Sequence, residues 1–205
     1  MPMNPRVLST LSLLSLTLGA PAALAQDSED RPIQGSGFAF GVRTGLGLPL
    51  GLLEGGDGHE DRKLRDVVDG IIPVQLDAGF FLGSSFYVGA SFQYARTLLD
   101  GGCPEGTECS ASDLRFGVNA SFHFPVSGRM SPWLGVGAGY EILKPRGLAY
   151  KGVEFLNGQV GADFNLSGPV WAGPYAMFTA GRFTNVNEDR PHYWLIGGVR
   201  LLFRH

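Results

Sequence analysis

Charge is scarce in this sequence. Charged residues make up 17% of its 205 residues, against about a quarter in typical globular proteins. Lysine occurs only at Lys63, Lys144 and Lys151, all in predicted loops. A soluble antiparallel sheet would carry such residues along its outward face, so this shortage argues against one. The net charge is −3 and there is no basic patch, so we expect no nucleic-acid partner.

Long apolar runs are also missing. A membrane-spanning helix needs about 20 apolar residues, and the longest run, Val7–Leu18, is shorter. This run follows Arg6 and precedes Ala23-Leu24-Ala25, which is the order of a secretory signal peptide and its cleavage site. We therefore predict a signal peptide over residues 1–25 and a short periplasmic lead-in over residues 26–35.

Cysteine occurs only at Cys103 and Cys109, within one long predicted loop. An exported chain meets an oxidising compartment, so we expect a disulfide between them. Two more ligands would be needed for a zinc site, and no nearby His pair or second Cys pair supplies them. We predict no metal and no cofactor.

The sequence does contain a regular alternation of apolar with small or polar residues after residue 35, the period of β-strands. It marks about eight strands, at 36–48, 71–82, 86–98, 112–124, 131–143, 153–166, 170–183 and 191–204. Long connections (49–70, 99–111, 144–152 and 184–190) alternate with short ones (83–85, 125–130 and 167–169). Short turns at one end and long loops at the other are typical of a bacterial outer-membrane β-barrel.

The two faces of each strand differ in character. Residues 112–124 show it best: one face carries Leu114, Phe116, Val118, Ala120, Phe122 and Phe124, and the other carries Asp113, Arg115, Gly117, Asn119, Ser121 and His123. Residues 170–183 are ambiguous, since both faces are fairly apolar. The apolar set could face lipid, or it could fill the core of a soluble barrel. We favour lipid, because the other face is mostly glycine with isolated charges and would make a poor water-facing surface.

Aromatic residues near the strand ends fit the interfacial girdles of a membrane barrel. They are Phe86, Tyr87, Phe122, Phe124, Trp133, Trp171, Tyr193 and Phe203. With the short turns in the periplasm, both ends of the barrel sequence lie there too.

Charges on the small-residue face are expected to pair inside the barrel. The register places Arg43 and Asp77 at similar depth on neighbouring strands, and Arg115 and Glu141 near the outer end of adjacent strands. Asp163 and Arg200 both lie near the periplasmic end, though two strands apart, so that the charges roughly balance. Desolvated charges need such partners. We therefore predict a polar plug of paired charges, since an eight-stranded barrel is only just wide enough for side chains to fill it.

One strand carries a local motif, Pro132-Trp133-Leu134-Gly135-Val136-Gly137-Ala138-Gly139-Tyr140. It resembles a strand of the small outer-membrane β-barrels, the OmpA-like membrane domain and its relatives. The resemblance covers residues 36–205. It implies an all-β, eight-stranded antiparallel up-and-down transmembrane β-barrel in the bacterial outer membrane.

The long loops hold the other candidate residues. Residues 59–69 could form a short amphipathic helix, and Asp57, His59, Glu60 and Asp61 could bind calcium, although their spacing matches no EF-hand. We interpret them as a solvated charged loop.

The serine, threonine and histidine residues of the sequence give only weak evidence for a catalytic nucleophile and base. Ser121 and His123 share a face, but their Cα atoms should lie roughly 7 Å apart. His192 is expected near the outer rim, close to Thr184, Glu188 and Asp189. We predict no catalytic residues and no enzyme.

Taken together, the sequence predicts a monomeric outer-membrane barrel with a plugged interior and a structural or surface-interaction role. Its expected partners are membrane lipid and an extracellular ligand held by the loops. A porin-like channel for small solutes or ions and a lipid-modifying enzyme are the alternatives.

Overall fold

The computed structural model describes residues 35–56, 59–98, 111–124, 129–145, 148–186 and 190–205, with only the backbone described for residues 53–62. The predicted signal peptide, nearly all of the lead-in, and Cys103 and Cys109 with their predicted disulfide lie outside these residues. No helix in the described part of the chain is long and apolar enough to cross a membrane.

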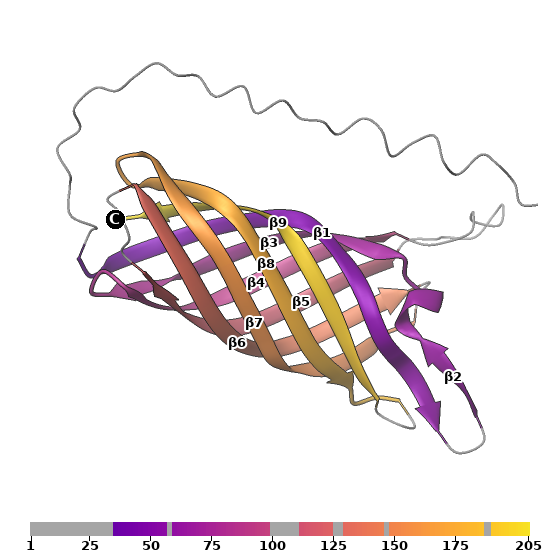
Figure 1. Ribbon diagram of the computed structural model, residues 1–205. Coiled ribbons are helices and arrows are strands. Elements are labelled where there is room, and N and C mark those ends of the chain that lie inside the picture. The colour runs from indigo at the N-terminus through magenta and orange to yellow at the C-terminus, as the bar shows by residue number, and fades with distance from the viewer. Residues whose placement is uncertain (1–34, 57–58, 99–110, 125–128, 146–147, 187–189) are drawn as a thin grey trace, which may run out of the picture.

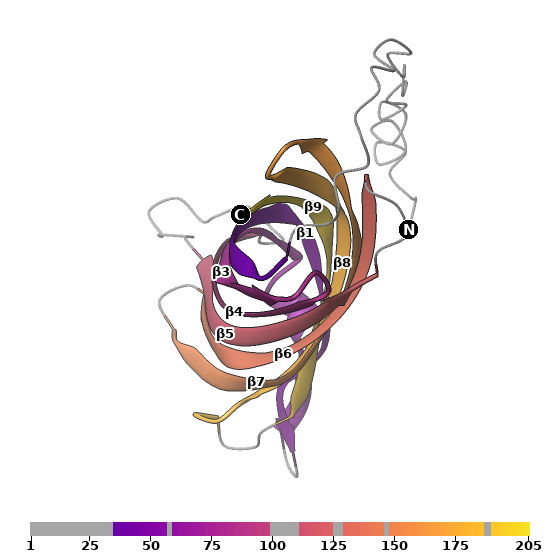
Figure 2. The same cartoon turned by 90° about the vertical axis from the view of Figure 1, so that its left-hand side faces the viewer.

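The alternating sequence forms one antiparallel sheet that closes on itself (Figures 1 and 2). Its strands are β1 (Gly37–Gly56), β2 (His59–Lys63), β3 (Gly70–Leu82), β4 (Phe86–Leu98), β5 (Ala111–His123), β6 (Met130–Pro145), β7 (Tyr150–Ser167), β8 (Val170–Phe183) and β9 (Pro191–Arg204). Each strand pairs with the next along the barrel, β1 pairs with β9 to close it, and β2 pairs only with β1. The predicted eight-stranded up-and-down barrel is therefore confirmed.

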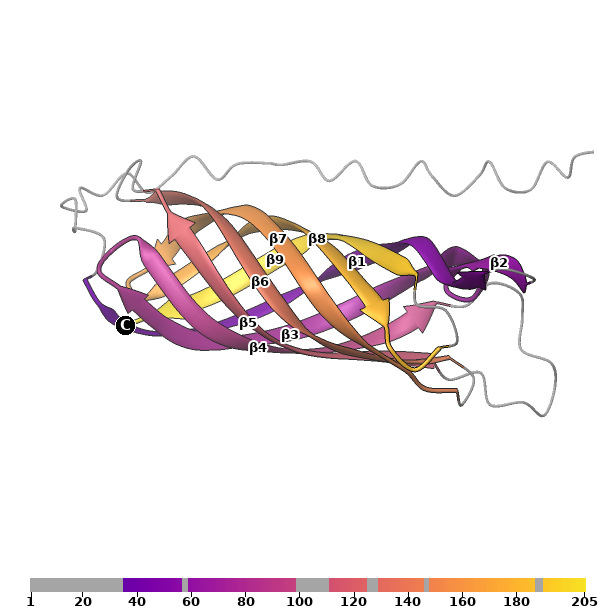
Figure 3. The same ribbon diagram turned by 90° about the horizontal axis from the view of Figure 1, so that it is seen from below.

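The two ends of the barrel differ, as the spacing of the connections predicts. The turn end carries the three short connections, the start of β1 and the end of β9. The loop end carries the four long connections, and the hairpin of β1 and β2 projects there beyond the other strands (Figure 3).

Burial confirms the predicted faces. Along β5 the side chains of Asp113 and Arg115 are buried, whereas Phe116 and Val118 are 48% and 66% exposed on the outside. In the ambiguous strand β8, Trp171, Tyr175 and Met177 point inward and are buried. An exposed apolar belt on a closed barrel is the surface of a protein that spans a bilayer.

Three predictions about positions are wrong. Residues 59–69 form strand β2 and the 3-10 turn η1 (Leu64–Asp66) instead of an amphipathic helix. Strand β1 runs past residue 48, where the predicted strand ends, because it pairs with β9 as far as Gly51. Gly51, with φ of +83°, bends the chain where β1 leaves β9 and begins to pair with β2. The three lysines lie at strand ends, not in loops.

Some predicted girdle aromatics are also misplaced. Tyr87, Trp133 and Trp171 are buried inside the barrel, because strand alternation outweighs the preference of aromatics for the interface. Trp133 has room because its neighbour on β7 is Gly161, where a Cβ atom would come within 2.7 Å of the indole ring. The other girdle residues are exposed or half-buried.

Candidate functional site in the barrel interior

The interior holds every acidic residue that the structure describes on strands β3–β9. Alternation turns these side chains inward, and all of them are buried: Asp77, Asp113, Glu141, Glu154 and Asp163. The basic residues beside them are Arg43, Arg115, Arg200 and Arg204, all buried as well. The lumen is the candidate site, because it gathers the charged groups that a pore or an active centre would use.

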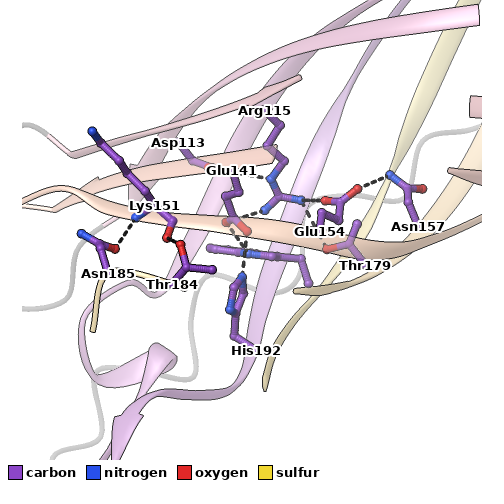
Figure 4. A network of polar contacts seen from close by, with 11 residues as sticks. Asp113, Arg115, Glu141, Lys151, Glu154, Asn157, Thr179, Thr184, Asn185 and His192 are labelled. Atoms are coloured by element: carbon purple, nitrogen blue, oxygen red, sulfur yellow. Dashed lines mark hydrogen bonds and ion pairs between the residues drawn. The ribbon is translucent and has the colours of Figure 1, made fainter. Parts of the chain in front are cut away.

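The loop half of the lumen is organised around Arg115 of β5 (Figure 4). Its Nε donates to Asp113 Oδ2 at 2.9 Å, Nη2 to Glu141 Oε1 at 3.2 Å and Nη1 to Glu154 Oε2 at 3.2 Å. Nη1 also lies 3.3 Å from Thr179 Oγ1 of β8. One guanidinium thus binds three carboxylates, and we call Asp113, Arg115, Glu141 and Glu154 the Arg115 cluster.

Residues of β9 complete this half from the opposite wall. His192 Nε2 lies 2.7 Å from Glu141 Oε2, and Trp194 Nε1 donates to Glu141 Oε1 at 3.1 Å. The His192 ring stacks on Phe183, with ring centroids 4.1 Å apart. His192, predicted near the outer rim, is the second residue of β9 at the loop end, and its side chain turns inward and is buried against Glu141. Thr184 instead bonds the backbone of Lys151, and Glu188 and Asp189 lie outside the described residues.

The turn half holds separate ion pairs. Arg43 Nε lies 2.6 Å from Asp77 Oδ2, and Arg43 Nη1 donates to Gln159 Oε1 of β7 at 2.6 Å. Gln75 Nε2 donates to the other oxygen of Asp77 at 2.8 Å. Both oxygens of this buried carboxylate are therefore satisfied.

A second ion pair lies beside the first. Arg200 Nη2 is 3.3 Å from Asp163 Oδ2. Arg200 stands directly opposite Arg43 in the register of β1 and β9, which would bring two like charges together. The indole of Trp133 lies against both guanidinium groups, at 4.5 Å from Arg200 Cζ and 5.3 Å from Arg43 Cζ. Two carboxylates and one aromatic ring thus offset the repulsion between the two arginines.

A serine and a histidine meet near the turn end. Ser121 Oγ lies 3.2 Å from His123 Nε2, closer than the Cα spacing suggests, and Asp163 Oδ2 lies 3.9 Å from His123 Nδ1. These residue types can form a nucleophile and its base. However, all three side chains are buried, and the adjoining recess has no space for the centre of a water-sized molecule. This arrangement therefore offers no place for a substrate.

Buried apolar clusters lie toward both ends of the lumen. At the turn end, Phe81, Tyr87, Trp171, Ala39 and Leu202 form one buried cluster. At the loop end, Leu64 and Val68, from η1 and the residues that follow it, are fully buried in a second cluster that includes Leu143, Phe183 and Ile196. The η1 segment therefore packs into the loop end of the barrel.

Between the two halves lies a small polar cavity. Its lining includes Gln93, Arg115, Asn119, Glu154 and Asn157, and about 20 Å³ of it can hold the centre of a water-sized molecule. That is room for roughly one water molecule. Among the side chains that the structure describes, no three His, Cys, Asp or Glu residues are arranged to hold a metal ion. The side chains of Asp57, His59, Glu60 and Asp61, the candidate calcium ligands, lie outside that set.

The structure brings together the three predicted pairs, Arg43 with Asp77, Arg115 with Glu141, and Arg200 with Asp163. Sequence reasoning missed Asp113 and Glu154 as partners of Arg115. Asp113 could have been found from its position two residues before Arg115 on the same face. Glu154 reaches Arg115 across the lumen, and strand register gives no signal for that contact.

Comparisons with known proteins were made on sequence and on structure. No protein-family model matches the chain. No curated protein matches it either. Among solved structures, Neisserial surface protein A is similar, with a TM-score of 0.52 and 11% identity over 84% of this chain and 100% of that one. The outer membrane protein AlkL gives a TM-score of 0.48 at 14% identity, covering 89% of this chain and 97% of that one. OprG from Pseudomonas aeruginosa gives 0.46 at 13% identity, covering 84% and 98%.

The chain therefore has the fold of the small outer-membrane β-barrels. This fold, together with the exposed apolar belt, places the barrel in the bacterial outer membrane, as the sequence predicts. At these identities the likeness concerns the fold alone.

Proposed function

We propose that this protein is a closed, monomeric outer-membrane barrel that does not conduct, and that it acts structurally or through an outside partner at its loop end. The observation that carries the proposal is the set of polar contacts that cross the lumen. Arg43 of β1 reaches Gln159 of β7, Arg115 of β5 reaches Glu154 of β7, and Glu141 of β6 reaches Trp194 of β9. None of these strand pairs are neighbours in the sheet.

Energetics support a permanent closure. Each crossing contact includes a buried charged group, and removing one partner of a buried ion pair, such as Arg115 with Glu154, typically costs about 3–5 kcal/mol. Opening a pore would require several of these contacts to break together. The apolar clusters at the two ends would also have to separate and admit water.

Recording in planar bilayers tests this function. The purified barrel, shown to be folded by a heat-dependent shift of its mobility in SDS, is compared with a large open porin under the same conditions. We expect no steady conductance steps from the wild type. We also expect none from Leu64→Gly/Val68→Gly, which empties the loop-end mouth but keeps the charged contacts. Steady steps from the wild type would overturn the proposal, and steps from the variant alone would assign the closure to the η1 segment.

A further inference from the structure

The charged side chains on the outside of strands β3–β9 are all basic. In the part of the chain that the structure describes, they are Arg96, Lys144, Lys151 and Arg182, and each is exposed. Every described acid on the same strands is buried inside the barrel. The wall thus separates charge by sign, because strand alternation sends the carboxylates inward and these four cations outward.

These four residues also share one end of the barrel. Each lies within two residues of the point where its strand reaches the loop end, on β4, β6, β7 and β8. The ends of these strands that face the short turns carry no outward charge in the described residues. Arg129, in the turn before β6, is an exposed cation at that opposite end. The outward-facing charges of these strands therefore all lie at the level of one membrane leaflet.

The strand register makes these residues neighbours. Arg96 stands opposite Ser112 of β5, and Ser112 stands opposite Lys144. Lys151 stands opposite Ile142 and so lies diagonally from Lys144. Directly opposed residues have Cβ atoms about 4.5–5.5 Å apart, and diagonal ones are within reach of long side chains. We call Arg96, Ser112, Lys144 and Lys151 the basic row, and Arg182, diagonal to Lys151 on β8, extends it.

The surroundings of the basic row select its partner. Below it lies the apolar belt, with Val153 and Phe155 of β7 exposed at 43% and 50%. Lys151 extends away from the interior charges in Figure 4. Long basic side chains at such a boundary place their charged ends at the depth of the lipid headgroups. A run of cations with no outward acid on the described strands β3–β9 is complementary to an anionic headgroup, and the guanidinium fork suits phosphate oxygens.

We propose that the basic row binds the phosphate groups of anionic lipids in the leaflet at the loop end. Arg96, Ser112 and Lys144 hold one phosphate between them, with the Ser112 hydroxyl donating to an oxygen. Lys151 attracts a second phosphate on the neighbouring strand. The inference rests on the barrel spanning a membrane and is independent of whether its lumen is closed.

The test measures which lipids stay with the barrel. The full chain is refolded into phosphatidylcholine vesicles that contain a minor fraction of phosphatidic acid and is then extracted in mild detergent, and retained lipids are counted by native mass spectrometry. The variant is Arg96→Gln/Lys144→Gln/Lys151→Gln, and the matched control is Arg129→Gln at the opposite rim. A basic residue near an anionic surface contributes about a fivefold preference. We therefore expect the wild type and the control to enrich phosphatidic acid, and the triple variant to lose at least about tenfold of that enrichment.

Other outcomes are informative. Equal enrichment in the triple variant would overturn the inference. Complete displacement of the lipid by inorganic phosphate at the same concentration would also overturn it and would assign the row to a soluble anion. A chain that shows no heat-dependent shift in SDS and does not enter the vesicles would contradict the membrane barrel itself. That failure is thus distinguished from failure of the basic row.

Discussion

The two halves of the barrel interior compensate their charges in different ways. In the turn half, Arg43 has Asp77 and Arg200 has Asp163, one carboxylate for each guanidinium. In the loop half, the one guanidinium of Arg115 contacts Asp113, Glu141 and Glu154. Each guanidinium of the turn half thus has its own carboxylate, whereas three carboxylates of the loop half share one guanidinium.

The largest expected effect comes from removing the central cation of each half. Arg115→Met leaves three buried carboxylates without their common cation, although Glu141 still accepts from Trp194 and Glu154 from Asn157. Arg43→Met leaves one carboxylate, Asp77, which still accepts from Gln75. We expect Arg115→Met to lower the free energy of unfolding by about 5 kcal/mol and Arg43→Met by about 3 kcal/mol. Urea titration of the barrel refolded into vesicles measures both. Equal losses would contradict the difference between the halves.

A medium effect is expected when both partners are replaced by apolar residues. Arg43→Met/Asp77→Leu removes a whole pair, and such replacements are often neutral or stabilising. Arg115→Met/Glu141→Leu still leaves Asp113 and Glu154 uncompensated. We expect the first double variant to unfold within about 1 kcal/mol of the wild type and the second to remain about 3 kcal/mol less stable. The same urea titration measures both free energies of unfolding. Similar values for the two variants would argue against Arg115 as the shared partner of three carboxylates.

The smallest effect on stability is expected when Asp113, one of the three carboxylates around Arg115, is neutralised. Asp113→Asn removes one of three negative charges around Arg115, and one oxygen of Asp113 has no hydrogen-bond partner. Asp77→Asn instead removes the only carboxylate of Arg43. We expect Asp113→Asn to change stability by no more than about 1 kcal/mol and Asp77→Asn to cost about 3 kcal/mol. Thermal unfolding in SDS, read from the mobility shift, compares them, and a larger loss for Asp113→Asn would show that all three carboxylates are required.

Strand alternation predicted much of this molecule. The faces of β5 followed from period 2 alone, because Arg115 must point opposite to Phe116. The same rule places Trp133 inside, on the face of Gly135, and it holds there against the preference of aromatics for the interface. The position of β2 could not be predicted, because it pairs with an extension of β1 that follows Gly51 and has a weak apolar pattern.

Contacts across the lumen could not be predicted from strand alternation and register. Arg115 and Glu141 are opposite each other on adjacent strands, so register alone brings them together. Glu154 reaches Arg115 only because the sheet curves into a narrow closed barrel. The contact of His192 with Glu141 likewise joins strands that are not neighbours in the sheet, so strand register gave no signal for it.

Thiol labelling tests the closed lumen most directly. Single cysteines, Thr179→Cys in the loop half and Ser121→Cys in the turn half, are introduced after Cys103 and Cys109 are replaced by serine. Asn185→Cys, at an exposed loop position, is the control. A small water-soluble thiol reagent is added to the folded barrel in vesicles and again after unfolding. The account predicts that both lumen cysteines react only after unfolding. Reaction of either one in the folded barrel at the rate of the control would contradict a closed interior.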